Sequence, residues 1–190
     1  MGRLRILPVA ALALLALGQG LAAPRPAAAQ TAASVVYVVP IDGVIDLGLA
    51  PFLARTLREA EAAGAAAVVL DINTFGGRVD AAVAMRDALI NSPVRTIAFV
   101  NQRAISAGAL IALACETVVM TRAGTIGAAA PVVGAGGGQP MPADEKSVSY
   151  VRKEFRATAE ARGRPPLVAE AMVDADVAIP GVVDKGKLLT

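Results

Sequence analysis

Short apolar runs alternate with segments of helical periodicity along most of the chain. The runs are rich in β-branched residues and have the length of buried strands. The segments between them repeat apolar residues every three or four positions, which is typical of amphipathic helices. The predicted strands cover residues 35–41, 66–72, 94–100 and 117–120. The predicted helices cover residues 49–63, 79–90, 106–115 and 144–162.

This alternation predicts the fold class. Strands that alternate with helices at such short intervals indicate an α/β domain with a largely parallel sheet covered by helices. A length of 190 residues suits one domain. Turns or loops are expected where the strands end, at residues 42–43, 73–77 and 101–105, and ligands in such folds gather at those ends. A glycine-rich stretch predicts a mobile loop over residues 134–142.

The first residues have the pattern of a secretory signal peptide. Arg3 and Arg5 precede an apolar run over residues 6–18, and alanines 27–29 provide an A-x-A cleavage site. The alternative is an uncleaved membrane anchor, but this run is shorter than the roughly 20 residues that span a bilayer. We therefore predict a signal peptide over residues 1–29 and an exported, periplasmic or extracytoplasmic domain over residues 30–190.

Removal of the signal peptide changes the charge of the chain. The whole sequence has 18 basic and 16 acidic residues. Residues 1–29 contain three arginines and no acid, which leaves 15 basic residues against 16 acidic ones and a net charge of −1. Because aromatic residues are also scarce, at 3%, the composition does not indicate a nucleic-acid partner.

The sequence contains no histidine, and this restricts the possible chemistry. A Ser-His-Asp or Cys-His catalytic site cannot form, and the commonest zinc ligand is missing. The single cysteine, Cys115, lies beside an apolar run, which favours a place in the core over a role as nucleophile. No metal or other cofactor is indicated.

Two segments at predicted strand ends could form an active site. Gly76 and Gly77 allow close approach of a substrate backbone and leave N–H groups for an oxyanion, although a simple tight turn would use the same residues. Ser106 starts a predicted helix, where it is either an N-cap or a nucleophile. Without histidine its base could be a lysine, a carboxylate or the amino group of the chain terminus. Lys146 follows the glycine-rich loop and could lean over a cleft, or it could be an ordinary surface lysine.

Four motifs in order add a resemblance to a known family. D-I-N-T-F-G-G-R at residues 71–78 resembles a D-T-P-G-G-R oxyanion turn, and A-I-S-A-G at 104–108 resembles an A-x-S-A-G nucleophile segment. T-I-G-A at 125–128 and K-S-V-S-Y at 146–150 resemble a T-x-I-G-A strand motif and the segment with the catalytic lysine. Together they resemble the ClpP-class serine peptidases of the ClpP/crotonase superfamily, and most closely the NfeD family of membrane-bound serine proteases.

The resemblance implies a ClpP/crotonase-like spiral of ββα units. It also implies a serine peptidase in which Ser106 is the nucleophile and Lys146 the base, with an oxyanion hole formed by the N–H groups of Gly77 and Ala107. An extended substrate would pair with the backbone of Gly76, Arg78 and Val79. Family analogy further implies homo-oligomers and substrates in hydrophobic segments of membrane-associated proteins, including stomatin-like partners.

The chain departs from the family pattern at two points. Phe75 replaces the proline that usually precedes the two glycines, so the turn geometry is expected to differ. Fuller NfeD proteins continue into transmembrane helices and a small β-domain, which suggests a short form or a fragment here. Two rival functions stay open: a crotonase-type acyl-thioester enzyme, and a binding module whose peptidase site has decayed.

Overall fold

The computed structural model describes residues 34–134 and 141–190 of the chain. The main sheet consists of β1 (Val36–Ile45), β2 (Ala67–Gly77), β3 (Thr96–Ile105), β4 (Thr117–Met120) and β5 (Thr125–Gly127). The helices are α1 (Leu49–Ala62), α2 (Val79–Ile90), α3 (Ala107–Ala114), α4 (Glu145–Ala161) and α5 (Pro166–Ala171). A separate short hairpin joins β6 (Val132–Val133) to β7 (Met141–Pro142). The predicted signal peptide and residues 135–140 of the predicted loop lie outside the described residues.

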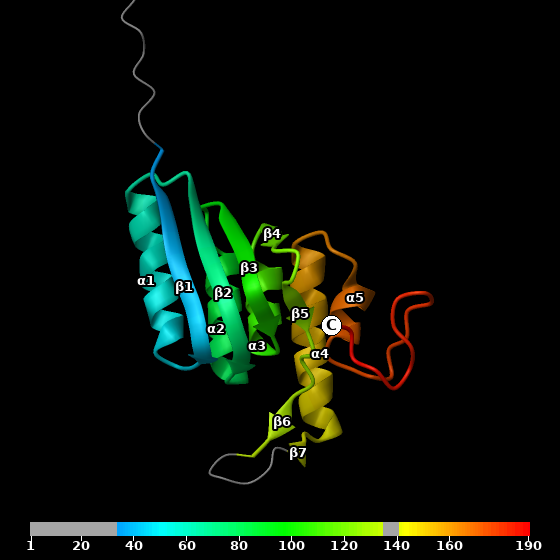
Figure 1. Cartoon of the computed structure of the whole chain (residues 1–190). Helices are drawn as coiled ribbons and strands as arrows, with labels where there is room; N and C mark the ends of the chain where they lie inside the picture. The colour runs from blue at the N-terminus through cyan, green and yellow to red at the C-terminus, as the bar shows by residue number, and fades with distance from the viewer. Residues whose placement is uncertain (1–33, 135–140) are drawn as a thin grey trace, which may run out of the picture. The chain divides into compact units, whose positions relative to one another are not determined.

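All strand pairs in the main sheet are parallel. Its order is β1-β2-β3-β4, and β5 pairs with the carboxyl-terminal part of β3 (Figure 1). Helices α1, α2 and α3 form the connections between successive strands. This arrangement confirms the predicted α/β class with a largely parallel sheet.

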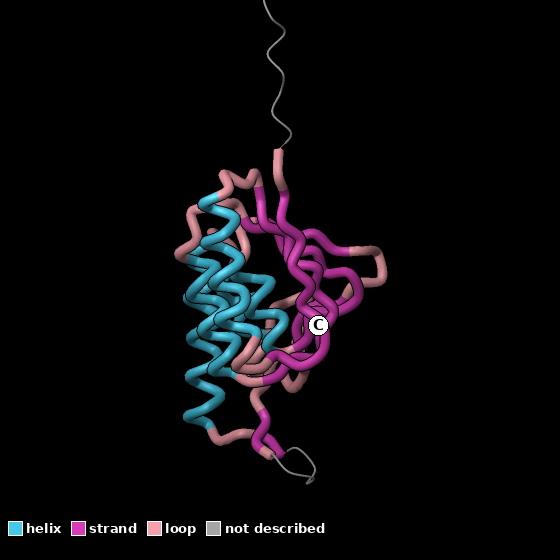
Figure 2. Tube along the Cα trace, turned by 90° about the vertical axis from the view of Figure 1, so that its left-hand side faces the viewer, coloured by secondary structure: helices cyan, strands magenta, loops and turns pink. Residues whose placement is uncertain are grey.

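The helices cover only one face of the sheet. In Figure 2 the helices stand together on the left and the strands of the sheet on the right. Along β2, Val68, Leu70 and Ile72 point into the core and are fully buried, whereas the side chains between them are partly exposed. The expectation that helices would cover the sheet is therefore correct for one face, and within residues 34–134 and 141–190 the other face carries no helix.

Helix α3 occupies the centre of the core. All eight of its residues are buried, and it contacts β2, β3 and α2. Because it contains only alanine, glycine, leucine and isoleucine, neighbouring elements can approach it closely on every side. The prediction of a fully buried helix is confirmed.

Three predicted strand ends are wrong. β1 continues through the predicted turn at residues 42–43, β2 through residues 73–77, and β3 through residues 101–105. Register shifts between Asp42 and Val44 and between Ile72 and Thr74 mark irregular pairing there. The strands therefore extend directly into the residues of the predicted active site.

Ion pairs connect α4 to the segment that follows it. Arg152 pairs with Asp174, and Arg156 pairs with Glu170 of α5 at 3.2 Å. Helix α5 was not predicted from the sequence. Pro166 in fact begins α5, because proline is favoured in the first turn of a helix.

Candidate active site

Ser106 lies in a strained conformation between β3 and α3. Its φ is 56° and its ψ is −119°, in a region that residues other than glycine rarely adopt. Hydrogen bonds fix this conformation: the Ser106 N–H donates to the Gly127 carbonyl at 2.9 Å, and its own carbonyl accepts from the Ala109 N–H at 2.9 Å. Such strain costs about 1–3 kcal/mol and is concentrated at functional sites.

The Ser106 hydroxyl does not serve as a helix cap. Ser106 occupies the N-cap position of α3, but its side chain accepts no hydrogen bond from the first turn of the helix. An N-cap serine normally has an extended backbone and accepts such a bond. Ser106 therefore occupies the N-cap position, but its hydroxyl does not act as a cap.

The structure brings Gly76, near the end of β2, into contact with Ser106. Gly76 has a φ of 106°, and a Cβ atom added to it would lie 2.7 Å from Ser106 Cβ and 3.1 Å from Ser106 Oγ. A side chain on Gly77 would clash with the backbone of Ile45. Neighbouring atoms lie too close to both glycines to leave room for a side chain, which explains why two glycines occur in succession.

Thr74 holds the backbone of Gly76 in place, although the predicted site residues did not include Thr74. Its buried hydroxyl donates to the Gly43 carbonyl at 2.5 Å and accepts from the Gly76 N–H at 2.9 Å. On its other side, a Cβ atom on Gly108 would lie 2.5 Å from Thr74 Cγ2. Thr74 thus contacts both segments of the predicted oxyanion hole. Its position immediately before Phe75-Gly76-Gly77, on the inward face of β2, was the available signal.

The rest of the predicted substrate stretch is partly engaged within the fold. The Arg78 N–H donates to the Ile45 carbonyl at 2.8 Å, and the Arg78 guanidinium pairs with Asp80 at 2.7 Å. This pair raises the pKa of Arg78 and lowers that of Asp80, chiefly through their side-chain hydrogen bond. The N–H groups of Gly76 and Arg78 are therefore engaged within the fold and not free for an oxyanion or a substrate.

Lys146 lies in the first turn of α4, with an exposed side chain. Asp144 caps this helix by accepting a 2.9 Å hydrogen bond from the Ser147 N–H. The side chain of Ser147 and then this N–H lower the pKa of Asp144 through their hydrogen bonds. Among the described residues no hydrogen bond joins Lys146 to Ser106. The neighbouring Ser147, however, lines a pocket together with Val79, Tyr150 and Val151. The lysine-bearing turn therefore borders the same pocket as the end of the predicted substrate stretch.

Cys115 is fully buried at the end of α3, as predicted. Burial raises the pKa of its thiol to about 12, so that no appreciable thiolate exists near neutral pH. Residues 34–134 and 141–190 contain no cluster of three or more acidic or cysteine side chains that could hold a metal ion. These observations leave the serine as the candidate nucleophile.

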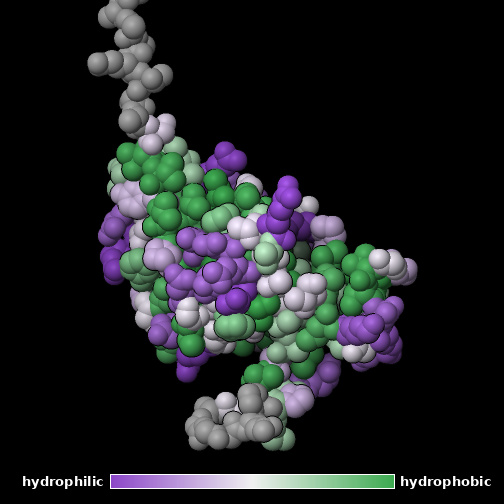
Figure 3. Space-filling view, in the orientation of Figure 1, coloured by the Kyte–Doolittle hydropathy of each residue, from purple (hydrophilic) through white to green (hydrophobic). Residues whose placement is uncertain are grey.

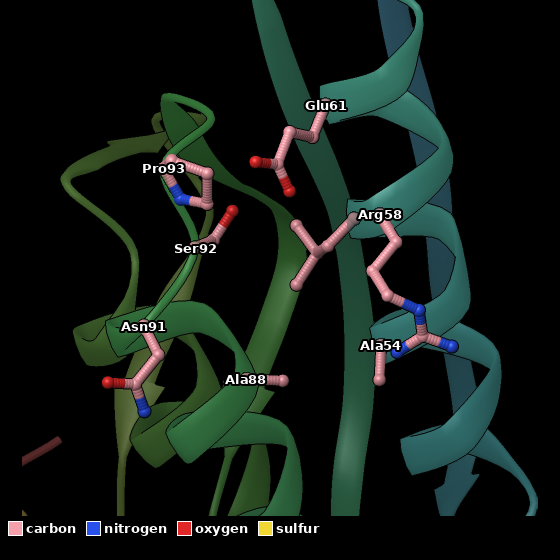
Figure 4. A pocket seen from close by; sticks show the side chains of 8 residues that line it. Ala54, Arg58, Glu61, Ala88, Asn91, Ser92 and Pro93 are labelled. Atoms are coloured by element: carbon pink, nitrogen blue, oxygen red, sulfur yellow. The ribbon is translucent and has the colours of Figure 1, made fainter.

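A further pocket lies away from these residues, between α1 and the segment after α2. It encloses about 170 Å³, and in Figure 4 Glu61 extends from α1 toward Ser92. Its lining includes none of the predicted site residues: Ala54, Leu57, Arg58, Glu61, Ala88, Asn91, Ser92 and Pro93. This pocket is therefore separate from the candidate active site around Ser106.

Comparison with known proteins gives two curated relatives. The chain is 42% identical over 156 residues to membrane protein NfeD1b of Bacillus subtilis, covering 82% of this chain and 35% of that protein. It is 29% identical over 152 residues to the membrane-bound protease PH1510 of Pyrococcus horikoshii, covering 78% and 34%. The chain thus spans about a third of the length of these relatives. In the described residues, no helix has the length and apolar character needed to cross a membrane.

Two solved structures of a membrane-bound stomatin-specific protease are similar to this chain. A serine-to-alanine mutant superposes with a TM-score of 0.70 at 29% identity, covering 78% of this chain and 73% of the other. A lysine-to-alanine mutant in complex with a substrate peptide gives a TM-score of 0.70 at 28% identity, covering 77% and 68%. These matches confirm the predicted ClpP-class fold. Because residues 35–190 also match the family described as "NfeD1b, N-terminal domain", the chain belongs to the NfeD1b N-terminal domain family.

Proposed function

We propose that this domain is a serine endopeptidase in which Ser106 is the nucleophile and Lys146 the general base. The observation that carries the proposal is the strained strand-to-helix turn at Ser106, with the hydroxyl uncapped and Gly76 against it. Enzymes with a nucleophile elbow expose their serine on such a turn. The absence of histidine leaves a lysine as the most suitable base.

The similar structures support the same pair of residues. They are structures of a protease in which one serine and one lysine were each replaced by alanine. Ser106 and Lys146 are 40 positions apart, and the two replaced residues are separated by nearly the same number of positions in their own chain. The motifs around Ser106 and Lys146 resemble the corresponding family segments.

The proposed mechanism uses groups of this chain only. Neutral Lys146 accepts the proton of Ser106 Oγ as that oxygen attacks a peptide carbonyl. The N–H groups of Gly77 and Ala107 stabilise the oxyanion, and the amino end of α3 adds a favourable potential. Lys146 then donates a proton to the leaving amine, and water hydrolyses the acyl-enzyme by the same route.

Substrate binding assembles the dyad in this proposal. The Lys146 side chain is exposed, and a lysine is a good base only when desolvation lowers its pKa. An extended peptide that pairs with Gly77 and Val79 would lie between Ser106 and the first turn of α4. It would exclude water from Lys146 and bring it within reach of Ser106.

The proposed substrates are hydrophobic segments of membrane-associated proteins in an extracytoplasmic compartment, including stomatin-like partners. The names of the relatives, a membrane protein and a membrane-bound stomatin-specific protease, support this proposal. We also propose that the domain acts as a homodimer or a higher homo-oligomer. No cofactor is required by the mechanism.

Peptide hydrolysis by the wild type, Ser106→Ala and Lys146→Ala tests the proposal. Ser106→Ala is expected to abolish hydrolysis, and Lys146→Ala to reduce kcat at least about 100-fold. Lys153→Ala is the matched control, because Lys153 is an exposed lysine on the same helix. A fluorophosphonate probe should label the wild type at Ser106.

The same assay distinguishes the rival functions. Hydrolysis that persists in Ser106→Ala contradicts the dyad. Turnover of an acyl thioester that is independent of Ser106 indicates a crotonase-type enzyme. Peptide binding without hydrolysis indicates a binding module.

A further inference from the structure

Another pocket lies beside Gly76 and Gly77, at the carboxyl ends of β1 and β2. It encloses about 530 Å³. Its lining consists of Gly43, Val44, Asn73, Thr74, Phe75, Gly76, Gly77 and Arg103. Gly77, a proposed oxyanion donor, therefore forms part of its wall. A peptide bound across Gly77 must extend past this pocket or into it.

Arg103 gives the pocket a single positive charge. Its guanidinium carbon lies 4.6 Å from the centroid of the Phe75 ring, a cation–π contact that orients the planar group. Among the described residues Arg103 forms no ion pair within 4.0 Å. A guanidinium stacked on a ring through its face still presents its N–H groups at the edge.

No carboxylate of the described residues compensates this charge within the pocket. None of the lining residues is acidic. Asp42 is opposite Asn73 in the strand register, but it is neither part of the lining nor paired with Arg103. Figure 3 shows the face of the sheet without helices, where hydrophilic side chains gather over the strands. The pocket thus combines an unpaired cation with apolar walls from Val44 and Phe75, which are 72% and 73% exposed.

Asn73 adds an unused hydrogen-bond acceptor. Its Oδ1 is buried and has no partner among the described residues. A buried acceptor without a partner is destabilising, so a ligand that supplies an N–H group would be favoured. The pocket therefore offers an acceptor for an amide N–H and donors for an anion. A peptide segment with a carboxylate has both groups.

We infer that this pocket is a subsite for a carboxylate of the peptide, held by Arg103 over Phe75. The carboxylate belongs either to an Asp or Glu side chain or to the carboxyl terminus of the peptide. Phe75 is part of the arrangement, because its ring orients the guanidinium of Arg103. The inference rests on the proposed function in taking a peptide as the ligand, and it names a feature that this function does not require.

Binding to the Ser106→Ala protein tests the subsite without catalysis. The probes are fluorescent apolar peptides with one Glu, the same peptides with Gln, and both forms with a free or an amidated carboxyl terminus. Fluorescence anisotropy measures Kd. We expect a carboxylate-bearing peptide to bind about tenfold more tightly than its neutral counterpart, a difference that disappears in the double variant Ser106→Ala/Arg103→Gln.

Three further variants make the test specific. Arg103→Glu should reverse the preference toward a Lys-containing peptide. Phe75→Leu keeps an apolar wall without the ring and should reduce the discrimination by severalfold. Arg95→Gln is the control, because Arg95 is an exposed arginine immediately before the other end of β3 and should leave the discrimination unchanged. The Gln peptides and the amidated peptides show whether a side-chain carboxylate or the terminal carboxylate is bound.

The outcomes separate this inference from the proposed function. Discrimination that depends on Arg103 supports the subsite, even if the wild type hydrolyses no peptide. Hydrolysis by the wild type with equal kcat/KM for Glu and Gln peptides overturns the subsite and leaves the peptidase intact. Equal Kd values, discrimination unchanged in Arg103→Gln, or no binding of any peptide at millimolar concentration also overturn it.

Discussion

At the scale of single residues, the hydroxyl of Thr74 explains how two distant segments keep one geometry. It joins the Gly43 carbonyl in β1 to the Gly76 N–H, and its methyl group packs on Gly108 in α3. Gly76 in turn contacts Ser106. Because catalysis is sensitive to displacements of about 1 Å, a residue at this junction is expected to control the position of the proposed oxyanion donors.

Removal of this hydroxyl is predicted to reduce catalysis more than substrate binding. Thr74→Val keeps the shape but leaves the Gly43 carbonyl and the Gly76 N–H without their partner. We expect kcat to fall about 10- to 100-fold with little change in KM, because an oxyanion donor acts in the transition state. Steady-state peptide kinetics measure the effect. Thr74→Ser should retain most of the activity; a loss in Thr74→Ser with none in Thr74→Val would assign the effect to the methyl group instead.

Gly76→Ala is predicted to disrupt the contact with Ser106 directly. The new Cβ atom would lie 2.7 Å from Ser106 Cβ, at a backbone φ of 106°. Gly64→Ala is the control for backbone strain alone, since Gly64 has a φ of 61° and open space around its Cα. Urea unfolding should show a larger loss of stability for Gly76→Ala, and fluorophosphonate labelling of Ser106 should be lost only there. Equal labelling of both variants would contradict the proposed geometry.

At the scale of elements, the hydrophobic pattern predicted the existence and order of the main strands and helices but placed three strand ends too early. Asp42, Asn73 and Asn101 interrupt the apolar runs and therefore indicated turns. In the structure these residues continue the strands. Polar side chains are tolerated at such positions because no helix covers that face among the described residues, a feature of packing that local periodicity cannot reveal.

The two proposed catalytic residues differ in how far the sequence could indicate them. Ser106 follows a strand and precedes a buried helix, so its place at a strand end was predictable, whereas its positive φ was not. Lys146 is exposed and local periodicity gives it no special role. Its place after the glycine-rich loop left a surface lysine equally open, and only the resemblance to a family favoured a base, because the contact that would make it one depends on tertiary structure and on the substrate.

The segment Arg162-Gly163-Arg164 has a structural role at the ends of two helices. Arg164 donates to the carbonyls of Leu113, Cys115 and Glu116 at 2.8–3.1 Å. Arg162 donates to the carbonyls of Ala114 and Leu89. These carbonyls lie at or beyond the carboxyl ends of α3 and α2, where no intrahelical donors remain. Partial burial lowers the pKa of Arg164, and the three carbonyl partners compensate its desolvation.

Arg164→Lys is therefore predicted to destabilise the domain although it preserves the charge. A lysine cannot reproduce the planar, multiple donation of a guanidinium. We expect a loss of about 2 kcal/mol in the free energy of unfolding, measured by urea denaturation. Arg122→Lys, at an exposed arginine after β4, serves as the control and should change stability by less than about 0.5 kcal/mol. Similar losses in both variants would show that the carbonyl contacts contribute little.

At the scale of the whole molecule, the single cysteine reports on the integrity of the core. Cys115 is fully buried, and its environment includes Ile111, Thr96 and the caps from Arg164. Alkylation of this thiol requires its exposure, so native protein should resist iodoacetamide and react only through opened or unfolded molecules. Peptide hydrolysis should likewise survive thiol reagents while remaining sensitive to fluorophosphonates. Inhibition by iodoacetamide without unfolding would argue against Ser106 as the nucleophile.

The same thiol makes the stability of the domain depend on alkaline pH. Its pKa is about 12 in the folded state against 9.0 for an unperturbed thiol, so above pH 9 the unfolded chain binds fewer protons than the folded one. Its contribution is therefore complete below pH 9 and is lost as pH rises toward 12. Between pH 8 and pH 10 the wild type should lose about 1.4 kcal/mol more unfolding free energy than Cys115→Ala, measured in urea at each pH. Parallel pH profiles for the two proteins would show that Cys115 becomes hydrated in the folded state, and that the core around α3 is more open than its packing indicates.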